Sequence, residues 1–431
     1  MYSFYMRPRF VALIMLFVAV SAKAEMQPWT LEASVRQAML TAPELKKSLA
    51  EIGARKEDIK LSSMWPDPSI ELRVDNKMGK SDNSGGYDLT DVVISQPIPL
   101  SRIKYQKSAA EAWLGATEYS RDYPALLVQN RVATVFHQLQ LAAAEVSLAQ
   151  KRLQLADELE RLSRKNAKGV VVRYLTPLEK MRLKIIREEA SQAASSAEGR
   201  YSEALSEFAR LLGIKTDHAA TVTELKPVTV MPERASLFAS LNSHAKLVSQ
   251  QQQLVAATRQ VDVARNSQLA DPTLSLFRSR DTFTSGREDV YGVMVNVQIP
   301  LHSRKSAAVS KANYRASEQR IELGRIRRDL EINLQRSYEH LHHVVGQAEE
   351  YRTKVLVPAA KMLELTRNGF TSGELNMLNL VDANNTYFEA RLSYLNLLYR
   401  ARTELADLRL YAGTMITGAD AYQPANNTGG R

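Results

Sequence analysis

The chain carries the same strand motif twice, and this duplication restricts its fold more than any other feature. Asp67-Pro68 opens an alternating segment that leads, through a loop with Gly and Ser, to Pro99-Leu100. Asp271-Pro272 opens a second such segment that leads to Pro300-Leu301. The Asp-Pro pairs are 204 residues apart and the Pro-Leu pairs 201 residues apart. Length alone suggests two or three domains for 431 residues, but the repeat indicates one unit built twice.

Each copy predicts a pair of β-strands with one apolar and one polar face. Apolar residues recur at every second position: Ile70, Leu72 and Val74 in the first copy, and Tyr291, Val293, Val295, Val297 and Ile299 in the second. Charged, amide or small residues occupy the positions between them, which is the period of a half-buried strand. The polar stretches Lys77–Tyr87 and Arg280–Asp289 are expected to be the hairpin tips.

Long helices are predicted on both sides of each strand pair. The expected helices cover Trp29–Met64, Ser101–Ala167, Pro177–Leu212, Ala235–Leu269 and Ser303–Asn368, with a last helix that follows a turn at Gly369–Leu375 and runs to Ala412. Thr30 is placed as a helix cap, and Gly213 and Gly413 as stops. In the second long helix one heptad seam begins at Leu139 and Ala142, and a second begins at Leu141 and Leu148 on nearly the opposite side. A helix with two seams packs between two neighbours.

Composition narrows the setting of the protein. Arg7 and Arg9, the apolar run Phe10–Val20 and Ala22-Lys23-Ala24 together resemble a cleavable export signal, so residues 1–24 are expected to be removed. The sequence contains no cysteine, which excludes disulfides and thiolate chemistry. The net charge of +10 is spread along helices among Glu and Asp, so it indicates solvated surfaces and no nucleic-acid partner.

The number of strands per chain predicts an assembly. About ten residues with one apolar face suit a tilted transmembrane strand, and such strands must close into a barrel because lipid satisfies no backbone hydrogen bonds. One chain offers only four strands, whereas single-chain barrels begin at about eight, where side chains fill the interior. Three chains would give twelve strands and an open lumen. We therefore predict a homotrimer whose long helices close into a tube below the barrel.

The residues also carry a family resemblance. The tandem repeat, the Asp-Pro strand openings, the ending Gln96-Pro97-Ile98-Pro99-Leu100 and the pattern Phe370-x-x-Gly373…Leu378-x-x-Val381-Asp382-Ala383 resemble the TolC-type outer-membrane factors from about Trp29 to Gly413. The segment from Asp67 to Asn76 is most similar to the CzcC-like, heavy-metal efflux branch of that family. The resemblance implies a mainly α-helical fold with a β-barrel part. It also implies docking to a periplasmic adaptor (membrane fusion protein) and an inner-membrane pump of the resistance-nodulation-division (RND) type.

The resemblance also implies where function is located. Asp382 matches a position where relatives place an aspartate at the periplasmic gate, while Asn379 stands where others have a second acid; Phe370 belongs to the same tip. A solvated surface aspartate is the alternative interpretation of Asp382. Adaptor contact is expected at the two helical turns, at Gly169, Arg173, Leu175, Thr176, Gly369, Gly373 and Leu375, although Gly369 and Gly373 are also typical turn glycines.

The expected organisation is a signal (1–24), a first repeat (25–213), a connector (214–234), a second repeat (235–413) and a disordered tail (414–431). No cofactor or catalytic group is expected, since no catalytic motif occurs. His340 and His343, near Glu339 and His342, have the spacing of a helical metal site, but a hydrated helix face explains them more simply. The predicted function is an exit duct for heavy-metal efflux. The alternatives are a soluble periplasmic adaptor or coiled-coil scaffold, and a duct for drugs or for type I secretion.

Overall fold

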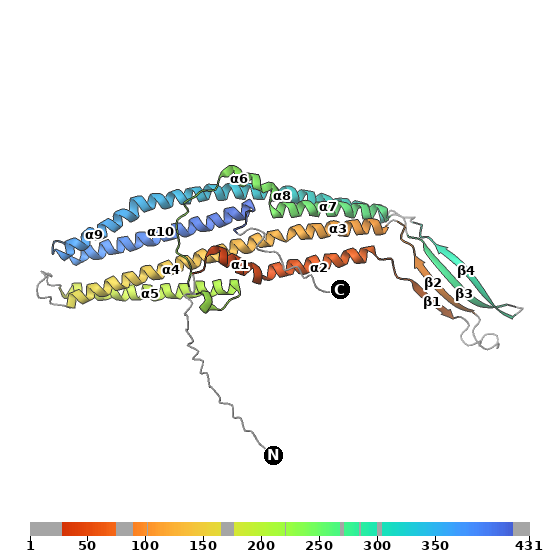
Figure 1. Ribbon diagram of the computed structural model, residues 1–431, viewed down its shortest axis with the longest axis horizontal. Helices are drawn as coiled ribbons and strands as arrows, with labels where there is room; N and C mark the ends of the chain where they lie inside the picture. The colour runs from red at the N-terminus through yellow and green to blue at the C-terminus, as the bar shows by residue number, and fades with distance from the viewer. Residues whose placement is uncertain are drawn as a thin grey trace, which may run out of the picture.

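A computed structural model describes residues 28–74, 89–100, 102–164, 176–219, 221–267, 271–283, 286–299 and 304–416. Long helices run side by side along an elongated body, and a β-sheet extends from one end (Figure 1). The turn between the last two helices lies at the opposite end. The strands and the helical tip are therefore the two extremes of the molecule.

The four strands form one antiparallel sheet in the order β1-β2-β3-β4. Their bounds are Ser69–Val74 (β1), Leu89–Pro97 (β2), Thr273–Phe283 (β3) and Gly286–Asn296 (β4). β2 of the first half pairs directly with β3 of the second half, with Ile94 opposite Leu276. The two strand pairs thus join, and within the described residues the outer edges of β1 and β4 have no partner strand.

The helices form a wall to which both halves contribute. Those of the first half are α1 (Leu31–Thr41), α2 (Pro43–Ser63), α3 (Arg102–Ser120), α4 (Asp122–Arg164) and α5 (Pro177–Leu212). Those of the second half are α6 (Arg234–Ser240), α7 (Ala245–Asn266), α8 (Arg304–Tyr351), α9 (Val357–Thr371) and α10 (Met377–Ala412). Near the sheet the order across the wall is α2, α3, α7, α8, and near the tip it is α5, α4, α10, α9 (Figure 1).

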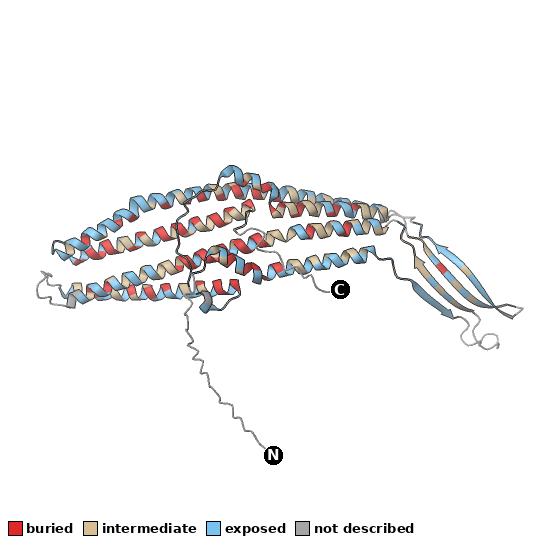
Figure 2. Cartoon of the chain, in the orientation of Figure 1, coloured by how far each residue is buried: buried red, intermediate tan, exposed pale blue. Residues whose placement is uncertain are grey.

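Buried residues follow the faces where these helices meet, and the outer edges of the wall stay exposed (Figure 2). The first seam of α4 packs on α5, where Leu139 and Ala142 meet Phe208. The second seam packs on α10, where Leu141 lies against Tyr394. The predicted two-sided packing of this helix is confirmed.

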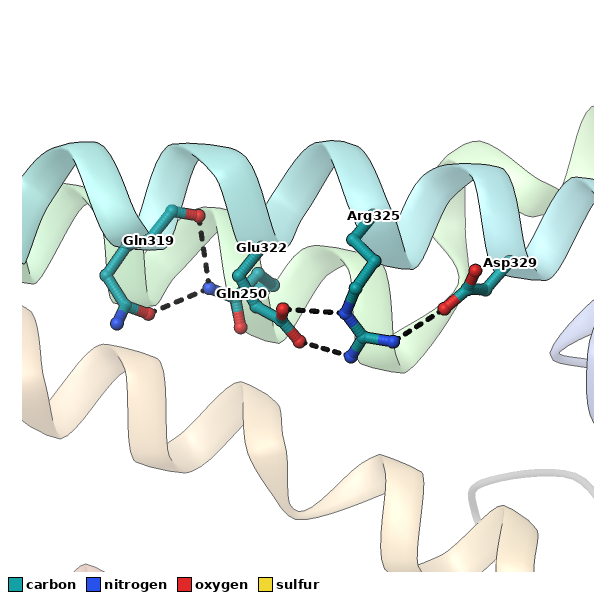
Figure 3. A network of polar contacts seen from close by, with 5 residues as sticks. All are labelled: Gln250, Gln319, Glu322, Arg325 and Asp329. Carbon is teal, nitrogen blue, oxygen red and sulfur yellow. Dashed lines mark hydrogen bonds and ion pairs between the residues drawn. The ribbon is translucent and has the colours of Figure 1, made fainter.

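The contact between α7 and α8 combines a buried hydrogen bond with exposed ion pairs (Figure 3). The Gln250 amide, only 6% exposed, donates to Gln319 Oε1 at 2.8 Å. Along α8, Arg325 donates to Glu322 at 2.8 Å and to Asp329 at 2.7 Å. Such exposed pairs stabilise a helix only weakly because solvent screens them, so they mark a hydrated face.

The predicted helix caps and stops are confirmed. Thr30 Oγ1 accepts from Ala33 N–H at 3.2 Å. Gly213 and Gly413 follow α5 and α10 with φ of 65° and 73°, the left-handed conformation that glycine adopts without strain.

Several predicted helices are, however, interrupted. Trp29–Met64 is divided into α1 and α2 at Ala42, because Pro43 has no N–H to continue the first helix. Ser101–Ala167 is divided at Arg121, three residues before Pro124. Ala235–Leu269 is divided into α6 and α7 by a short 3₁₀ turn, Leu241–Ser243.

The predicted helix Ser303–Asn368 contains a different irregularity. Arg352–Leu356 forms a π-helical turn just before Pro358. A proline removes one N–H donor, and a wider turn accommodates the carbonyl that this leaves without a partner.

The predicted tip Arg280–Asp289 is wrong, because β3 continues to Phe283 and β4 begins at Gly286. Its charges pair across the strands, with Arg280 Nε 2.8 Å from Asp289 Oδ1, so polarity did not indicate a loop here. β4 also ends at Asn296, before the predicted Ile299. The predicted tip at 77–87 and the predicted signal at 1–24 lie outside the described residues.

Candidate functional site

The outer face of the sheet is apolar and exposed. The strand register places Ile70, Ile94, Leu276 and Val293 in one row across all four strands. Their exposed fractions are 74, 49, 56 and 65%. Continuous apolar surface of this kind requires an apolar partner, because its contact with water is unfavourable. The predicted alternation of the strands is confirmed, with its apolar side turned outward.

The inner face of the sheet is mainly polar, with Val93, Phe277 and Met294 as its apolar members. It encloses a hollow of about 980 Å³ at the end nearest the helices. Ser95 and Ser275 face each other there with their hydroxyl oxygens 2.7 Å apart. Further charged and polar side chains line the hollow: Glu71, Arg73, Asp91, Thr273, Ser279 and Asn296. A sheet with a dry outer face and a wet inner face suits a barrel wall around an aqueous lumen.

One glycine on the inner face is required by packing. The ring of Phe277 lies over Gly292, its partner across the strands. A Cβ at position 292 would lie 2.3 Å from Phe277 Cζ, so any side chain there would move the ring. The large side chain thus covers the backbone that the glycine leaves bare.

The turn between α9 and α10 is compact and hydrogen-bonded. Gly369 O accepts from Glu374 N–H at 2.9 Å and from Leu375 N–H at 3.0 Å. A Cβ on Gly369 would lie 2.7 Å from Leu375 Cδ1, and Gly373 has φ of 83°. The turn geometry therefore explains why glycine stands at both positions. Contact of this turn with an adaptor remains a prediction.

The remaining tip residues are placed differently from one another. Phe370 is partly buried against a cluster that includes Leu183 and Val381. Thr176 is exposed and begins α5, while Gly169, Arg173 and Leu175 lie outside the described residues.

Asp382 lies on an exposed polar stripe of α10. Asn379 precedes it by one turn and is also exposed. The stripe continues along the same face with Thr386, Glu389 and Ser393, all exposed. The structure thus places Asp382 and Asn379 together on an open surface, whereas Phe370 packs into the protein.

Glu389 is a candidate that sequence reasoning missed. It follows Asp382 by seven residues, which is two turns, so both carboxylates occupy one face about 10 Å apart along the axis. The seven-residue spacing was the available signal. The stripe therefore carries two acids, although the position of Asn379 carries none.

The opposite side of α10 lines a groove toward α4. Tyr387, Arg391 and Leu395 line a hollow of about 610 Å³ there, roughly half a helical turn away from Asp382. Across the contact between these helices, Arg152 donates to Asn385 Oδ1 at 2.9 Å. The wall thus exposes an acidic stripe on one side of α10 and a groove on the other.

The histidines of α8 do not gather a metal site. His340 Nδ1 lies 2.8 Å from Glu404 Oε1, and His342 and His343 are exposed. Across the stretches described, no three or more His, Asp or Glu side chains are placed to hold a metal ion together.

A search of the described helices found none with the length and apolarity needed to cross a membrane.

Comparison with known proteins shows which family and which proteins the chain is similar to. The model of the outer membrane efflux protein family matches residues 238–414. The cobalt-zinc-cadmium resistance protein CzcC of Cupriavidus metallidurans is 23% identical over 390 residues, which cover 88% of this chain and 89% of CzcC. The alkaline protease secretion protein AprF of Pseudomonas aeruginosa is 24% identical over 327 residues, 72% of this chain and 66% of AprF.

Solved structures agree with this assignment at the level of the fold. CusC, whose crystal structures concern transmembrane channel formation, superposes with a TM-score of 0.70 at 15% identity. The superposition covers 96% of this chain and 99% of CusC. Residues 238–414 thus match the outer membrane efflux protein family, and the chain shares with CusC the fold of long helices and an antiparallel sheet.

Proposed function

We propose that this protein is the outer-membrane channel of a tripartite efflux system. The observation that carries the proposal is the sheet at the end of the helical wall, apolar outside and mainly polar inside, whose two outer edges have no partner strand among the described residues. This arrangement fits one sector of a transmembrane barrel that continues into a periplasmic tube. The division into two repeats, residues 25–213 and 235–413, joined by a connector, is part of the proposal.

The proposed channel is a homotrimer. Four strands per chain leave β1 and β4 as free edges, and β4 of one copy can pair with β1 of the next until the ring closes. The edge helices follow the same order, since α2 and α5 bound one side of the wall and α8 and α9 the other. A ring of three copies joins strand edge to strand edge and helix edge to helix edge.

The channel itself performs no bond chemistry in this proposal. An RND-type pump in the inner membrane supplies the energy, and a periplasmic adaptor seals the pump to the helical tip. The adaptor-contact residues are the two turns, Gly169 to Thr176 and Gly369 to Leu375.

The gate of the proposed channel is the acidic stripe of α10. Threefold symmetry would repeat Asp382 three times at one level of the tube, and Glu389 three times at a second level. Like charges held close together repel, and a ring of carboxylates attracts cations. Phe370 holds the turn beside the gate through its packed ring.

Heavy-metal cations are the proposed substrate. The similarity to a cobalt-zinc-cadmium resistance protein over most of both chains supports this assignment. A gate with two acidic levels also favours cations over anions.

Secretion of a protein substrate is the second candidate function, because AprF, whose match covers 72% of this chain, is a secretion protein. A soluble adaptor or scaffold is disfavoured, since its sheet would have no reason to expose the row from Ile70 to Val293.

A deletion strain separates these functions. Loss of the gene is expected to lower tolerance to cobalt, zinc and cadmium, and the wild-type gene should restore it. Unchanged tolerance to these metals would reject the metal assignment. Purified protein in planar bilayers should also conduct, and a protein that never forms channels would reject the duct itself.

A further inference from the structure

Two arginines extend from the apolar outer face of the sheet. Arg278 and Arg280 follow Leu274 and Leu276 at every second position of β3, so all four side chains share one face. The register places Arg278 opposite Tyr291 and Arg280 opposite Asp289 on β4. The inner hollow is lined by the alternate residues, including Ser275, Phe277 and Ser279, which confirms the direction of the arginines.

These arginines lie toward the end of the sheet that points away from the helices. In the proposed barrel this end is the one farthest from the periplasm. An arginine on the lipid face costs about 2–4 kcal/mol at the bilayer midplane and little near the headgroups. Arg278, Arg280 and the exposed Tyr291 therefore mark the level of the outer headgroups, where arginine and tyrosine are both favourable.

The two guanidinium groups share one carboxylate. Asp289 accepts from Arg280 Nε at 2.8 Å and Nη2 at 3.0 Å, and from Arg278 Nη2 at 3.0 Å. Within the described chain it is their only acidic partner. The cluster thus has a net charge of +1, and most of the ten N–H donors of the two side chains remain available.

We propose that Arg278 and Arg280 form a binding site for the phosphate of an anionic lipid headgroup in the outer leaflet. The planar guanidinium fork matches the oxygens of a phosphate, and Asp289 holds both forks side by side. The neighbouring apolar rows receive the acyl chains, so the lipid is recognised by its charge and its tails together. The inference rests on the proposed membrane insertion of the sheet.

The test uses the full chain reconstituted in phosphatidylcholine nanodiscs that contain diphosphorylated lipid A, dephosphorylated lipid A or neither. Native mass spectrometry measures the lipid that stays bound. We expect the wild-type protein to retain the phosphorylated lipid. The double variant Arg278→Gln/Arg280→Gln should bind it about tenfold more weakly. Arg73→Gln is the control, because it removes one positive charge from the inner face of the same sheet and should retain the lipid.

The site would be overturned if the double variant retained as much diphosphorylated lipid A as the wild type, or if the wild type retained as much dephosphorylated lipid A as diphosphorylated. It would also be overturned if inorganic phosphate displaced the bound lipid as effectively as added diphosphorylated lipid A does. Conductance of the same samples separates this inference from the proposed function. A conducting protein without phosphate dependence contradicts only the lipid site, whereas a protein that inserts into no bilayer contradicts the duct.

Discussion

Asp382 and Glu389 share a face of α10 but differ in depth from the tip, so their effects on ion flow should differ in size. We expect Asp382→Ala to lower the preference for cations or change the single-channel conductance, since it removes the stripe's carboxylate nearer the tip. Glu389→Gln should act in the same direction and less strongly. The measurement is the reversal potential in planar bilayers under a salt gradient.

The control for this gate is Glu198→Gln on α5, which removes an exposed carboxylate far from α10 along the chain. It should leave the reversal potential unchanged. Identical traces for wild-type protein and Asp382→Ala would reject the gating role and return Asp382 to a solvated helix surface.

His137 couples the stability of the wall to pH. Its side chain is 5% exposed on α4, and burial lowers its pKa from 6.5 to about 4, with a hydrogen bond to Gln140 opposing the shift. Arg402 and Arg409 on α10 also face it and lower its pKa. The unfolded chain therefore binds this proton more readily than the folded chain does, between the folded pKa and the unfolded pKa of 6.5.

The sign of the effect follows from this difference. The contribution of neutral His137 to the free energy of unfolding is complete above the unfolded pKa and is lost as the pH falls toward the folded pKa of about 4. The total loss amounts to roughly 3 kcal/mol. We expect His137→Gln to flatten the acid side of the stability curve measured by urea unfolding. His342→Gln, which changes an exposed histidine, should leave that slope as in the wild type; equal slopes for all three proteins would contradict the assignment.

Single helices and strands show which structural features are predictable from the sequence alone. The ends of α5 and α10 were predictable because Pro177, Gly213 and Gly413 act through their own backbone. The two faces of each strand are predictable because the alternation of apolar and polar residues is visible within one strand, without knowledge of its partner strands. Pairing across the strands is not predictable from the sequence pattern, and without that pairing the charges of Arg280 and Asp289 resemble those of a loop.

The breaks within the helices were harder to predict because several depend on tertiary contacts. The break at Pro43 is the exception, because it has a local cause in the proline itself. At His244 the side chain caps α7 by accepting from Lys246 N–H, while its other ring nitrogen lies 3.1 Å from Leu410 O on α10. Leu410 is 166 residues away in the sequence and approaches His244 only in the folded protein, so this contact is not predictable from the sequence. Likewise, the exposure of Glu389 beside Asp382 depends on which face of α10 the neighbours cover.

The start of α5 offers a test of an element against its proposed partner. Thr176 forms a capping box, in which its Oγ1 accepts from Glu179 N–H at 3.2 Å and Glu179 Oε2 accepts from Thr176 N–H at 2.7 Å. Thr176→Ala should destabilise the helix start by about 1 kcal/mol and accelerate amide exchange in its first turn. Thr176→Ser keeps the cap and should exchange like the wild type.

The same pair of variants separates two roles of Thr176. If adaptor binding falls in Thr176→Ala and is normal in Thr176→Ser, the residue acts by holding the turn. Reduced binding in both variants would instead indicate that the methyl group itself contacts the adaptor.

At the scale of the whole molecule, the wall has apolar side chains along both outer edges. Tyr314, Ile321 and Ile332 on α8 are 77, 74 and 63% exposed. At the other edge, Leu178, Met181 and Ile185 on α5 are 76, 65 and 53% exposed. A single chain gains nothing from these residues, whereas a ring of copies buries them at each junction.

We expect Ile321→Asp to weaken the trimer. Burial of an isoleucine contributes about 1.5–3 kcal/mol, and the variant would place an unpaired charge at every one of the three junctions. Light scattering of the detergent-solubilised protein should show a shift from trimer toward monomer at equal concentration. Val230→Asp, an equally exposed apolar position in the connector, should leave the mass unchanged. A trimer of unaltered stability in Ile321→Asp would mean that the edge at α8 faces solvent or lumen, and the ring would then have to close through other surfaces.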